Sequence, residues 1–312
     1  MQERNITAVV VTYNAEPFIK KCIRSLYEST VSISVVVVDN QSSDKTTQII
    51  TSNFPQVKLI QSAVNLGFGK ANNIGISWAL SNHADFIFLL NQDAWIEKNA
   101  LSELINIAET YPDYGILSPI HFGYDKQIWH RGFSKYVEMF APSLLTQSKA
   151  DFTKSLDVYE VDFVPAALWV LRSAALRKVG GFDPIYFMYG EDNDLAARVR
   201  LAGLKIGIVP SASGHHMEKD FSGTDIPLKR LVAKYFSGYS AILKYSNHNG
   251  IYRYLSIVKA GIKDAWIGIA QAKVRKVLAI SIALWTIFIS INKIEKSRSK
   301  IASEGAFLEI CN

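Results

Sequence analysis

The sequence predicts an α/β protein in which a mainly parallel sheet is flanked by helices and followed by a helical tail. Over residues 1–110, short β-branched runs alternate with stretches of helical periodicity, the pattern of parallel strands joined by right-handed crossover helices. Each run ends in polar residues, so we expect one polar edge on the sheet. From residue 226 onward the chain is basic and amphipathic, which predicts the tail.

Composition sets the class of protein. The 312 residues, 49% hydrophobic and 20% charged, can bury a sizeable core, which excludes a disordered or fibrous protein. Two cysteines, Cys22 and Cys311, lie at opposite ends of the chain; they predict no disulfide framework or zinc site and fit a reducing compartment. No signal peptide is expected, because a strand follows Met1 closely. We expect a body over residues 1–225 and a tail over residues 226–312.

The first half of the body contains four predicted strands and four predicted helices. The strands are expected over residues 6–11, 33–38, 57–60 and 86–90. The helices are expected from Pro17, over residues 45–52, up to Ser81, and over residues 98–109.

The fourth strand carries the strongest local signal. Its apolar run, residues 86–90, ends in Asn91, Gln92 and Asp93. Open α/β sheets bind ligands at the carboxyl ends of their strands, and the carboxylate of Asp93 could hold a divalent cation there. Taken alone, these three residues also fit a simple strand-end turn.

A dinucleotide-binding fold is the obvious alternative, and the sequence argues against it. That fold requires a glycine-rich turn directly after the first strand, where this chain has Thr12-Tyr-Asn-Ala-Glu16. The run Gly67-Phe-Gly-Lys-Ala-Asn72 imitates the motif only in part and comes too late in the chain.

The second half of the body is less regular. Residues 114–159 show a weak aromatic and polar pattern, which we interpret as strands and loops lining an acceptor cleft. A strand is predicted over residues 161–172, a short helix over residues 174–179, and a last strand over residues 205–209. His215 and His216 follow that last strand, and such a pair is a candidate for metal binding.

Acidic residues gather at one predicted helix start, Glu191-Asp-Asn-Asp194. Asp194 and Arg198 are spaced for an i,i+4 pair. The simplest interpretation is complementarity to the helix dipole. These acids, however, follow a loop whose aromatic residues, Tyr186, Phe187 and Tyr189, we expect to be exposed. An aromatic loop beside a carboxylate suits a sugar ring next to a general base.

Five motifs in the same order together resemble the family 2 glycosyltransferases with the GT-A fold, in particular bacterial rhamnosyltransferase-like members that build surface polysaccharide. The resemblance covers roughly residues 5–220, with a nucleotide-sugar half over residues 1–115 and an acceptor half over residues 116–225. The motifs are Val11-Thr-Tyr-Asn14, Val38-Asp-Asn-Gln-Ser-Ser-Asp44, Asn65-Leu-Gly-Phe-Gly-Lys-Ala-Asn-Asn-Ile-Gly75, Leu90-Asn-Gln-Asp93, and Gly181-Phe-Asp183 through Glu191-Asp-Asn-Asp194.

The resemblance implies a nucleotide-sugar pocket. Asp39 is similar to the carboxylate that meets the nucleotide base, and Thr12 and Asn14 to the neighbouring wall of the pocket. Asn65 and Asn72 fall in the segment that borders the ribose and the donor sugar. The remaining residues expected to contact substrate are Asn91, Trp169 and Glu191.

The resemblance also implies a reaction. Asp93 resembles the last residue of an Asp-X-Asp motif that holds Mg²⁺ or Mn²⁺ against the diphosphate, and His216 a histidine that completes the metal site, although His215 could serve instead. Asp192 resembles the catalytic base. We therefore expect inverting transfer of a sugar from a dTDP- or UDP-linked donor to a hydroxyl of a saccharide or lipid-linked acceptor.

Two departures from the family pattern bear on this expectation. Asn91 replaces the first Asp of Asp-X-Asp, which removes one anionic ligand; related rhamnosyltransferase-like sequences also carry Asn there. Pro165-Ala166 stands where many relatives have a glycine, which would narrow the acceptor side. A non-catalytic, membrane-associated sugar-nucleotide binder or assembly protein is therefore the alternative function.

The tail concentrates positive charge. Residues 229–300 hold 14 lysines and arginines against two acidic residues, a local charge of +12 in a chain of net charge +6, which leaves −6 for the rest. Its apolar segment, residues 277–291, would reach only about 22 Å as a helix, short of a roughly 30 Å hydrocarbon core. We favour an interfacial helix on an anionic membrane surface, at the cytoplasmic face, over a packed core helix, and a spanning helix least of all.

Other partners are less supported by the sequence. Nucleic acid could explain the basic excess, but no recognised binding module is present, so we do not expect it as a partner. The sequence is compatible with a homo-oligomer and does not decide the oligomeric state. The body is expected to fold without the region beyond about Ser256.

Overall fold

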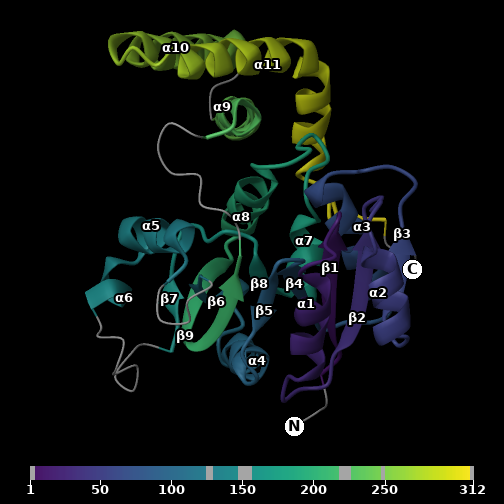
Figure 1. Ribbon diagram of the computed structural model, residues 1–312. Helices are drawn as coiled ribbons and strands as arrows, with labels where there is room; N and C mark the ends of the chain where they lie inside the picture. Colours follow the sequence, from purple (N-terminus) through teal and green to yellow (C-terminus); the bar gives the residue numbers. More distant parts are fainter. Residues whose placement is uncertain (1–3, 124–128, 147–156, 218–225, 247–249, 310–312) are drawn as a thin grey trace.

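The parallel half of the sheet agrees with the sequence. A computed structural model describes residues 4–123, 129–146, 157–217, 226–246 and 250–309 (Figure 1). The first four strands, all paired in parallel, are β1 (Ile6–Thr12), β2 (Ser34–Asp39), β3 (Lys58–Gln61) and β4 (Phe86–Asn91). The register sets Thr12 opposite Asp39 and Val11 opposite Asn91, so the polar strand ends share one edge.

The other half makes the sheet mixed. The order of the strands is β3-β2-β1-β4-β8-β6-β9-β5, and β7 pairs with β9. Strand β8 is antiparallel to β4 and β6, whereas β6 and β9 are parallel. The bounds are β5 (Ala94–Ile96), β6 (Tyr114–Phe122), β7 (Tyr159–Glu160), β8 (Leu168–Arg172) and β9 (Lys205–His216).

Alternation along the strands builds two cores, one on each face. In β1, Val9 packs with α3, α7 and α8, whereas Ala8 and Val10 pack with α1, α2 and α4. This alternation follows from the two-residue period of a strand. The helices of the two cores are α1 (Ile19–Tyr27), α2 (Thr46–Asn53), α3 (Phe68–Ser81), α4 (Ala100–Thr110), α7 (Ser173–Val179) and α8 (Glu191–Leu201).

Three predictions for the second half of the body were wrong. The segment interpreted as strands and loops contains β6 and then two helices, α5 (Arg131–Phe140) and α6 (Pro142–Thr146); α5 forms because Phe133 and Val137 bury one face. The strand expected from residue 161 begins at Leu168, because the chain turns at Pro165, which has no N–H for a ladder.

The third wrong prediction concerns the last strand, which continues to His216 instead of ending near residue 209. A register irregularity after Pro119 lets β6 pair with the far end of β9, and β5 pairs with that end from the other side. His215 and His216 therefore lie inside a strand, where they point to opposite faces.

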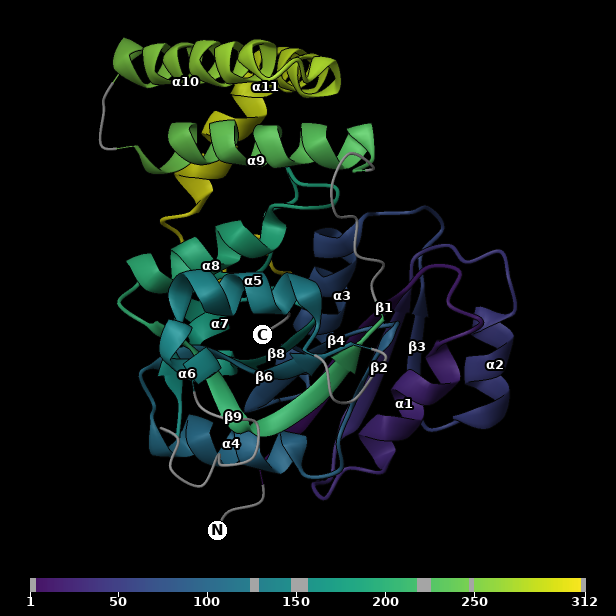
Figure 2. The same cartoon turned by 60° about the vertical axis from the view of Figure 1, so that its left-hand side comes forward.

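The C-terminal region is three helices and a return to the body. Helix α9 lies between α8 and the pair formed by α10 and α11 (Figures 1 and 2). After α11 the chain reaches the body again, where the N–H of Gly181 donates to the carbonyl of Ala306 at 2.8 Å. The three helices are α9 (Leu228–Tyr245), α10 (Ile251–Ala270) and α11 (Val274–Lys300).

Helix α11 is longer than the apolar segment that the sequence analysis compared with the thickness of a membrane. The apolar segment lies within a helix of 27 residues, about 40 Å long when measured along its axis, whose C-terminal part bends toward the body (Figure 1). Within the described ranges it is the one helix long and apolar enough to cross a membrane by length and composition. The prediction that the segment is too short to span was therefore wrong.

Candidate active site

Asp39 is held rigidly at the end of β2. The hydroxyl of Thr12 donates to Asp39 Oδ1 at 3.1 Å, and the N–H of Ser42 donates to Oδ2 at 3.1 Å. Both Thr12 and Asp39 are buried. The structure thus brings together Thr12 and Asp39, the two residues that the resemblance assigned to the pocket for the nucleotide base. The hydrogen bonds fix the orientation of the Asp39 carboxylate.

Asn14 connects the loops after β1 and β2. Its backbone has φ of +51°, a left-handed conformation that Asn tolerates better than most residues. Its side-chain oxygen accepts a hydrogen bond from the N–H of Ser43 at 2.8 Å, and its own N–H donates to Ser42 Oγ at 2.9 Å. The wall predicted for the pocket is therefore a single hydrogen-bonded unit.

Asn65 organises the turn before α3. Its side-chain oxygen accepts from Asn40 Nδ2 at 2.9 Å and from the N–H of Gly67 at 3.0 Å. Gly67 has φ of +80°, and a Cβ there would lie 2.1 Å from the carbonyl oxygen of Phe187. The turn therefore packs directly against the aromatic loop before α8.

Asn72 is buried in α3, where its Nδ2 donates to the carbonyl of Phe68 at 3.0 Å. The structure gives both Asn65 and Asn72 local roles in holding this segment. Contact with a donor sugar stays a prediction for each.

Asp93 and His216 lie together because β5 and β9 are antiparallel. Ala94 pairs with His216, which sets His216 Nε2 3.4 Å from an Asp93 carboxylate oxygen and 3.2 Å from Asn91 Nδ2. Burial acts to raise the pKa of Asp93, but the hydrogen bond and charge of His216 outweigh it and lower that pKa. The carboxylate is therefore ionised and available to a cation.

His215 points to the other face of the strand. Its Nε2 lies 2.8 Å from Glu97 Oε1, and its ring stacks on Trp95 with centroids 4.8 Å apart. Of the two histidines considered as metal ligands, only His216 adjoins Asp93.

The side chains near Asp93 could supply some, but not all, of the ligands that Mg²⁺ or Mn²⁺ requires. Among the described residues, no group of three or more His, Cys, Asp or Glu side chains is arranged to hold a metal ion. Asp93 and His216 supply one carboxylate and one imidazole, and Asn91 an amide. Mg²⁺ is commonly held by one or two carboxylates together with substrate phosphates and water, so these residues fit a cation whose remaining ligands come from a diphosphate.

Glu191 and Asp192 begin α8 at the same edge of the sheet. Gly190 precedes them with φ of +106°, a backbone conformation suited to glycine. Asp192 is half-buried and accepts hydrogen bonds from the N–H of Asn193 at 2.8 Å and from the backbone of Ala166. Burial raises the pKa of Asp192 despite these hydrogen bonds.

The contact with Ala166 places Asp192 near the cation site. The N–H of Asn91 donates to the carbonyl of Ala167 at 3.0 Å, and Ala166 is the next residue along. Two hydrogen bonds to adjacent residues therefore connect the predicted base with the strand end that carries Asp93.

Glu191 has a different environment from Asp192. It is buried, and Oε2 has no hydrogen-bond partner among the described residues. Burial and the neighbouring charges of Asp192 and Asp194 raise its pKa to about 8. Glu191 is therefore largely protonated at neutral pH, which favours Asp192 as the base.

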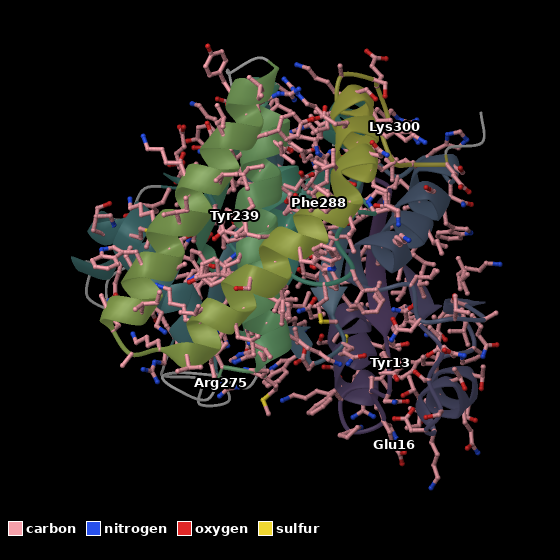
Figure 3. All side chains as sticks on the ribbon, turned by 90° about the horizontal axis from the view of Figure 1, so that it is seen from above. Tyr13, Glu16, Tyr239, Arg275, Phe288 and Lys300 are labelled. Carbon is pink, nitrogen blue, oxygen red and sulfur yellow. The ribbon has the colours of Figure 1, made fainter. Side chains whose placement is uncertain are left out.

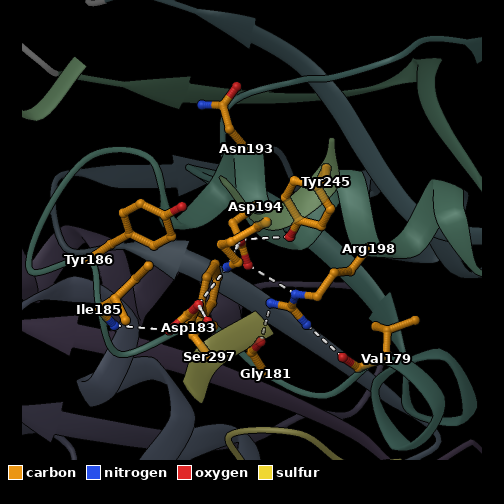
Figure 4. A network of polar contacts seen from close by, with 12 residues as sticks. Val179, Gly181, Asp183, Ile185, Tyr186, Asn193, Asp194, Arg198, Tyr245 and Ser297 are labelled. Carbon is orange, nitrogen blue, oxygen red and sulfur yellow. Dashed lines mark hydrogen bonds and ion pairs between the residues drawn. The ribbon is translucent and has the colours of Figure 1, made fainter. Parts of the chain in front are cut away.

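Asp194 belongs to a buried ionic network instead (Figure 4). It pairs with Arg198 at 2.9 Å, as the sequence predicted, and also with Lys244 of α9. Lys244 also contacts Asp183 at 2.5 Å, and Ser297 of α11 donates to Asp183. Sequence reasoning missed Lys244 and Ser297, because local spacing gives no sign of a partner 50 or more residues away.

Two predicted aromatic contacts are not accessible in the structure. Trp169 is completely buried; its indole N–H donates to the carbonyl of Val164 at 3.2 Å, and its ring stacks on Phe182. Tyr186, expected to be exposed, is buried too, and its hydroxyl lies 2.9 Å from Ser240 Oγ. Phe187 and Tyr189 are the exposed aromatic residues of that loop.

Comparison with known proteins gives the class of protein. The family model described as "Glycosyl transferase family 2" matches residues 7–180, more than half of the chain, and the chain belongs to this family. A second model, "N-terminal domain of galactosyltransferase", matches residues 164–220. The protein is a glycosyltransferase, as the sequence predicted.

Two curated relatives are rhamnosyltransferases. The chain is 29% identical over 269 residues to N-acetylglucosaminyl-diphospho-decaprenol L-rhamnosyltransferase of Mycobacterium tuberculosis, covering 80% of this chain and 86% of the relative. It is 27% identical over 228 residues to Rhamnosyltransferase WbbL of Escherichia coli (strain K12), covering 68% and 85%.

Solved structures confirm the GT-A fold. S. aureus TarS matches with a TM-score of 0.55 at 16% identity, covering 96% of this chain and 55% of that one. TarS 1-349 in complex with UDP-GlcNAc matches with a TM-score of 0.57 at 15% identity, covering 95% and 86%. At such identity the likeness concerns the fold alone.

Proposed function

We propose that this glycosyltransferase moves rhamnose from a dTDP- or UDP-linked donor to a hydroxyl of a lipid-linked saccharide, with inversion, during the synthesis of a bacterial surface polysaccharide. The sugar and the acceptor are suggested by the names of the two relatives, one of which includes a diphospho-decaprenol. The observation that carries the mechanism is the hydrogen-bonded connection from Asp192 through Ala166 and Ala167 to Asn91, which sets a candidate base beside a candidate diphosphate site.

The chemistry follows from these positions. Asp192 takes the proton of an acceptor hydroxyl while that oxygen bonds to the anomeric carbon and the bond to the diphosphate breaks. A single displacement on the face opposite the leaving group inverts the anomeric centre. Asp39, fixed by Thr12 and Ser42, orients the base of the nucleotide.

A divalent cation, Mg²⁺ or Mn²⁺, fits this scheme. Asp93 and His216, with Asn91 beside them, would hold it together with the diphosphate oxygens. When bound, it would stabilise the negative charge that develops on the leaving nucleoside diphosphate. We place this reaction at the cytoplasmic face of the membrane, where a lipid-linked acceptor is presented.

The direct test is product formation. The protein is incubated with a panel of dTDP- and UDP-linked sugars and a detergent-solubilised, lipid-linked saccharide; release of nucleoside diphosphate and the mass of the product are measured, and NMR assigns the anomeric configuration. We expect turnover with one donor and an inverted product. Retention of configuration would contradict the mechanism.

The alternative, a non-catalytic binder, is favoured by one observation: Asn91 stands where the family pattern has an aspartate. Nucleotide sugars would then raise the melting temperature, because ligand binding stabilises the native state, but no nucleoside diphosphate would be released with any acceptor.

The cation is tested with Asp93→Ala. We expect weaker binding of the nucleoside diphosphate in the presence of Mg²⁺ or Mn²⁺ and little change in EDTA, because the carboxylate acts through the cation. Calorimetry with and without chelator measures this. An equal loss of affinity in EDTA would show that Asp93 contacts the nucleotide directly.

A further inference from the structure

Helices α10 and α11 expose apolar stripes on their outward sides. On α10 the stripe recurs every three or four residues, which is one face of a helix, and α11 repeats the pattern. Together these side chains form what we call the hairpin face. Its members, each more than a third exposed, are Ile251, Tyr252, Leu255, Val258, Ile262, Trp266, Ile269, Val274, Leu278, Ile282, Trp285, Phe288 and Ile289.

The opposite sides of both helices are packed, so the hairpin face has a fixed shape. Ile257, Ile280 and Ile287 are buried in a third core shared with α9. At Gly261 an added Cβ would lie 2.8 Å from Leu284, so the two helices approach closely. Seen from above, α10 and the N-terminal part of α11 are outermost elements that contact each other (Figure 3). The C-terminal part of α11 turns toward the body (Figure 1). An exposed apolar area of this extent marks an interaction site.

Charge indicates the chemistry of the partner. Lys259, Lys263 and Lys273 are exposed beside the stripes. The two acidic residues of this region are directed inward: Asp264 accepts from the hydroxyl of Tyr239, and Glu295 from that of Tyr254, each at 3.0 Å. An apolar face is thus bordered by lysines, while Asp264 and Glu295 are hydrogen-bonded on the inner side. Such a face is complementary to an anionic lipid surface.

Contacts of α11 argue against the other arrangements. A spanning helix would have to leave the body, but Ile294 and Ser297 are buried and Ser297 donates to Asp183. A second copy of the chain on the same face would bring two strongly basic regions together, and such like-charge contacts are costly.

We propose that the hairpin face docks on an anionic membrane, with α10 and the N-terminal part of α11 lying in its plane. This rests on the proposed function in one respect: the acceptor is lipid-linked. Because α9 lies between this face and α8 (Figure 2), docking holds α8, and with it Asp192 in its first turn, at a fixed height over the bilayer. The apolar segment predicted from sequence covers only the α11 part of this surface; the α10 part comes from the structure.

The experiment is sedimentation of the full chain with vesicles of phosphatidylcholine, with or without phosphatidylglycerol. We expect binding that needs phosphatidylglycerol and is partly released by high salt. The double variant Ile262→Glu with Trp266→Glu, on α10, should lower vesicle affinity at least about tenfold, because neither position then has an apolar side chain to bury in the membrane. Met139→Glu, at an exposed apolar residue of α5, is the matched control and should bind as the wild type does.

The outcomes separate this proposal from the proposed function. Transfer to the detergent-solubilised acceptor should be the same for the wild type and the double variant, so vesicle binding without any transfer would overturn the function and leave the docking face standing. Equal sedimentation of the wild type and the double variant would overturn the docking face. So would a concentration-dependent dimer, measured without vesicles, that the double variant abolishes, because the occupant would then be a second copy.

Discussion

Asp192 and Glu191 are adjacent in sequence, but their carboxyl groups meet different surroundings. Asp192 is half-buried and receives hydrogen bonds that favour its ionised form, whereas Glu191 is buried with one oxygen unpaired among the described residues. The family resemblance named Asp192 as the base, but the residue pattern alone identified only the acidic cluster, because burial depends on how the helix start packs under the aromatic loop.

Asp192→Asn should keep donor binding and lose most turnover, because the amide keeps the shape of the side chain but cannot take the proton. Removal of a general base typically costs about 10²–10⁴-fold in rate. Steady-state kinetics measure the loss, and titration with the nucleoside diphosphate checks that the pocket is intact. A rate within about threefold of the wild type would exclude Asp192 as the base.

Glu191→Gln should change how stability depends on pH. Because the pKa of Glu191 is raised from 4.5 to about 8 on folding, the folded state binds the extra proton in that window. The stability it confers is therefore complete below pH 4.5 and is lost as the pH rises through 8. Urea unfolding of the wild type should show a decline in that window, at most about 1.4 kcal/mol per pH unit from this group, that the variant lacks. Parallel curves for the two proteins would contradict the assignment.

At the scale of elements, α8 is fixed from two sides. Asp194 lies near its start, and Lys244 of α9 connects it with Asp183 and so with Ser297 of α11. Burial acts to raise the pKa of Asp194, but the charges of Arg198 and Lys244 lower it. The network therefore holds ionised groups in the interior, and each depends on its partner.

Lys244→Met should destabilise the protein by about 3–5 kcal/mol, because it leaves the buried carboxylate of Asp183 without its cation and that of Asp194 with Arg198 alone. Lys234→Met, at an exposed lysine of the same helix, is the matched control and should change the free energy of unfolding by less than about 0.5 kcal/mol. Chemical denaturation measures both. If the two variants were equally stable, Lys244 would not compensate the buried acids.

For the whole molecule, the sequence predicted those features that depend on residues close together along the chain. The four parallel strands and their shared polar edge followed from β-branched runs and crossover spacing, and Thr12, Asp39, Asp93 and Asp192 lie at that edge. Pairing between distant segments could not be read in this way. The antiparallel contact that joins Asp93 to His216 depends on β5 and β9, which lie more than 100 residues apart. The apolar run around Trp169 predicted a strand, but not that the ring would be covered by the distant Phe182.

Contacts between the tail and the body are likewise formed by residues that lie far apart in the sequence. The sequence suggested a body that folds without the region beyond about Ser256, whereas in the structure residues of this region bond to the body. Ser297 donates to Asp183, Asn73 Nδ2 donates to the carbonyl of Phe307 at 3.0 Å, and Gly181 donates to Ala306.

Ending the chain after Ser256 would remove these three contacts, leave the N–H of Gly181 without its acceptor, and open the third core. We now expect the shortened protein to melt roughly 10 °C or more below the full chain, since a loss of several kcal/mol shifts the melting temperature by about 2–4 °C per kcal/mol in a protein of this size. The full-length double variant of the hairpin face should melt near the wild type, because it changes only exposed side chains. Thermal denaturation of the three proteins side by side decides the point: a shortened chain as stable as the full one would show that the tail is a separate appendage.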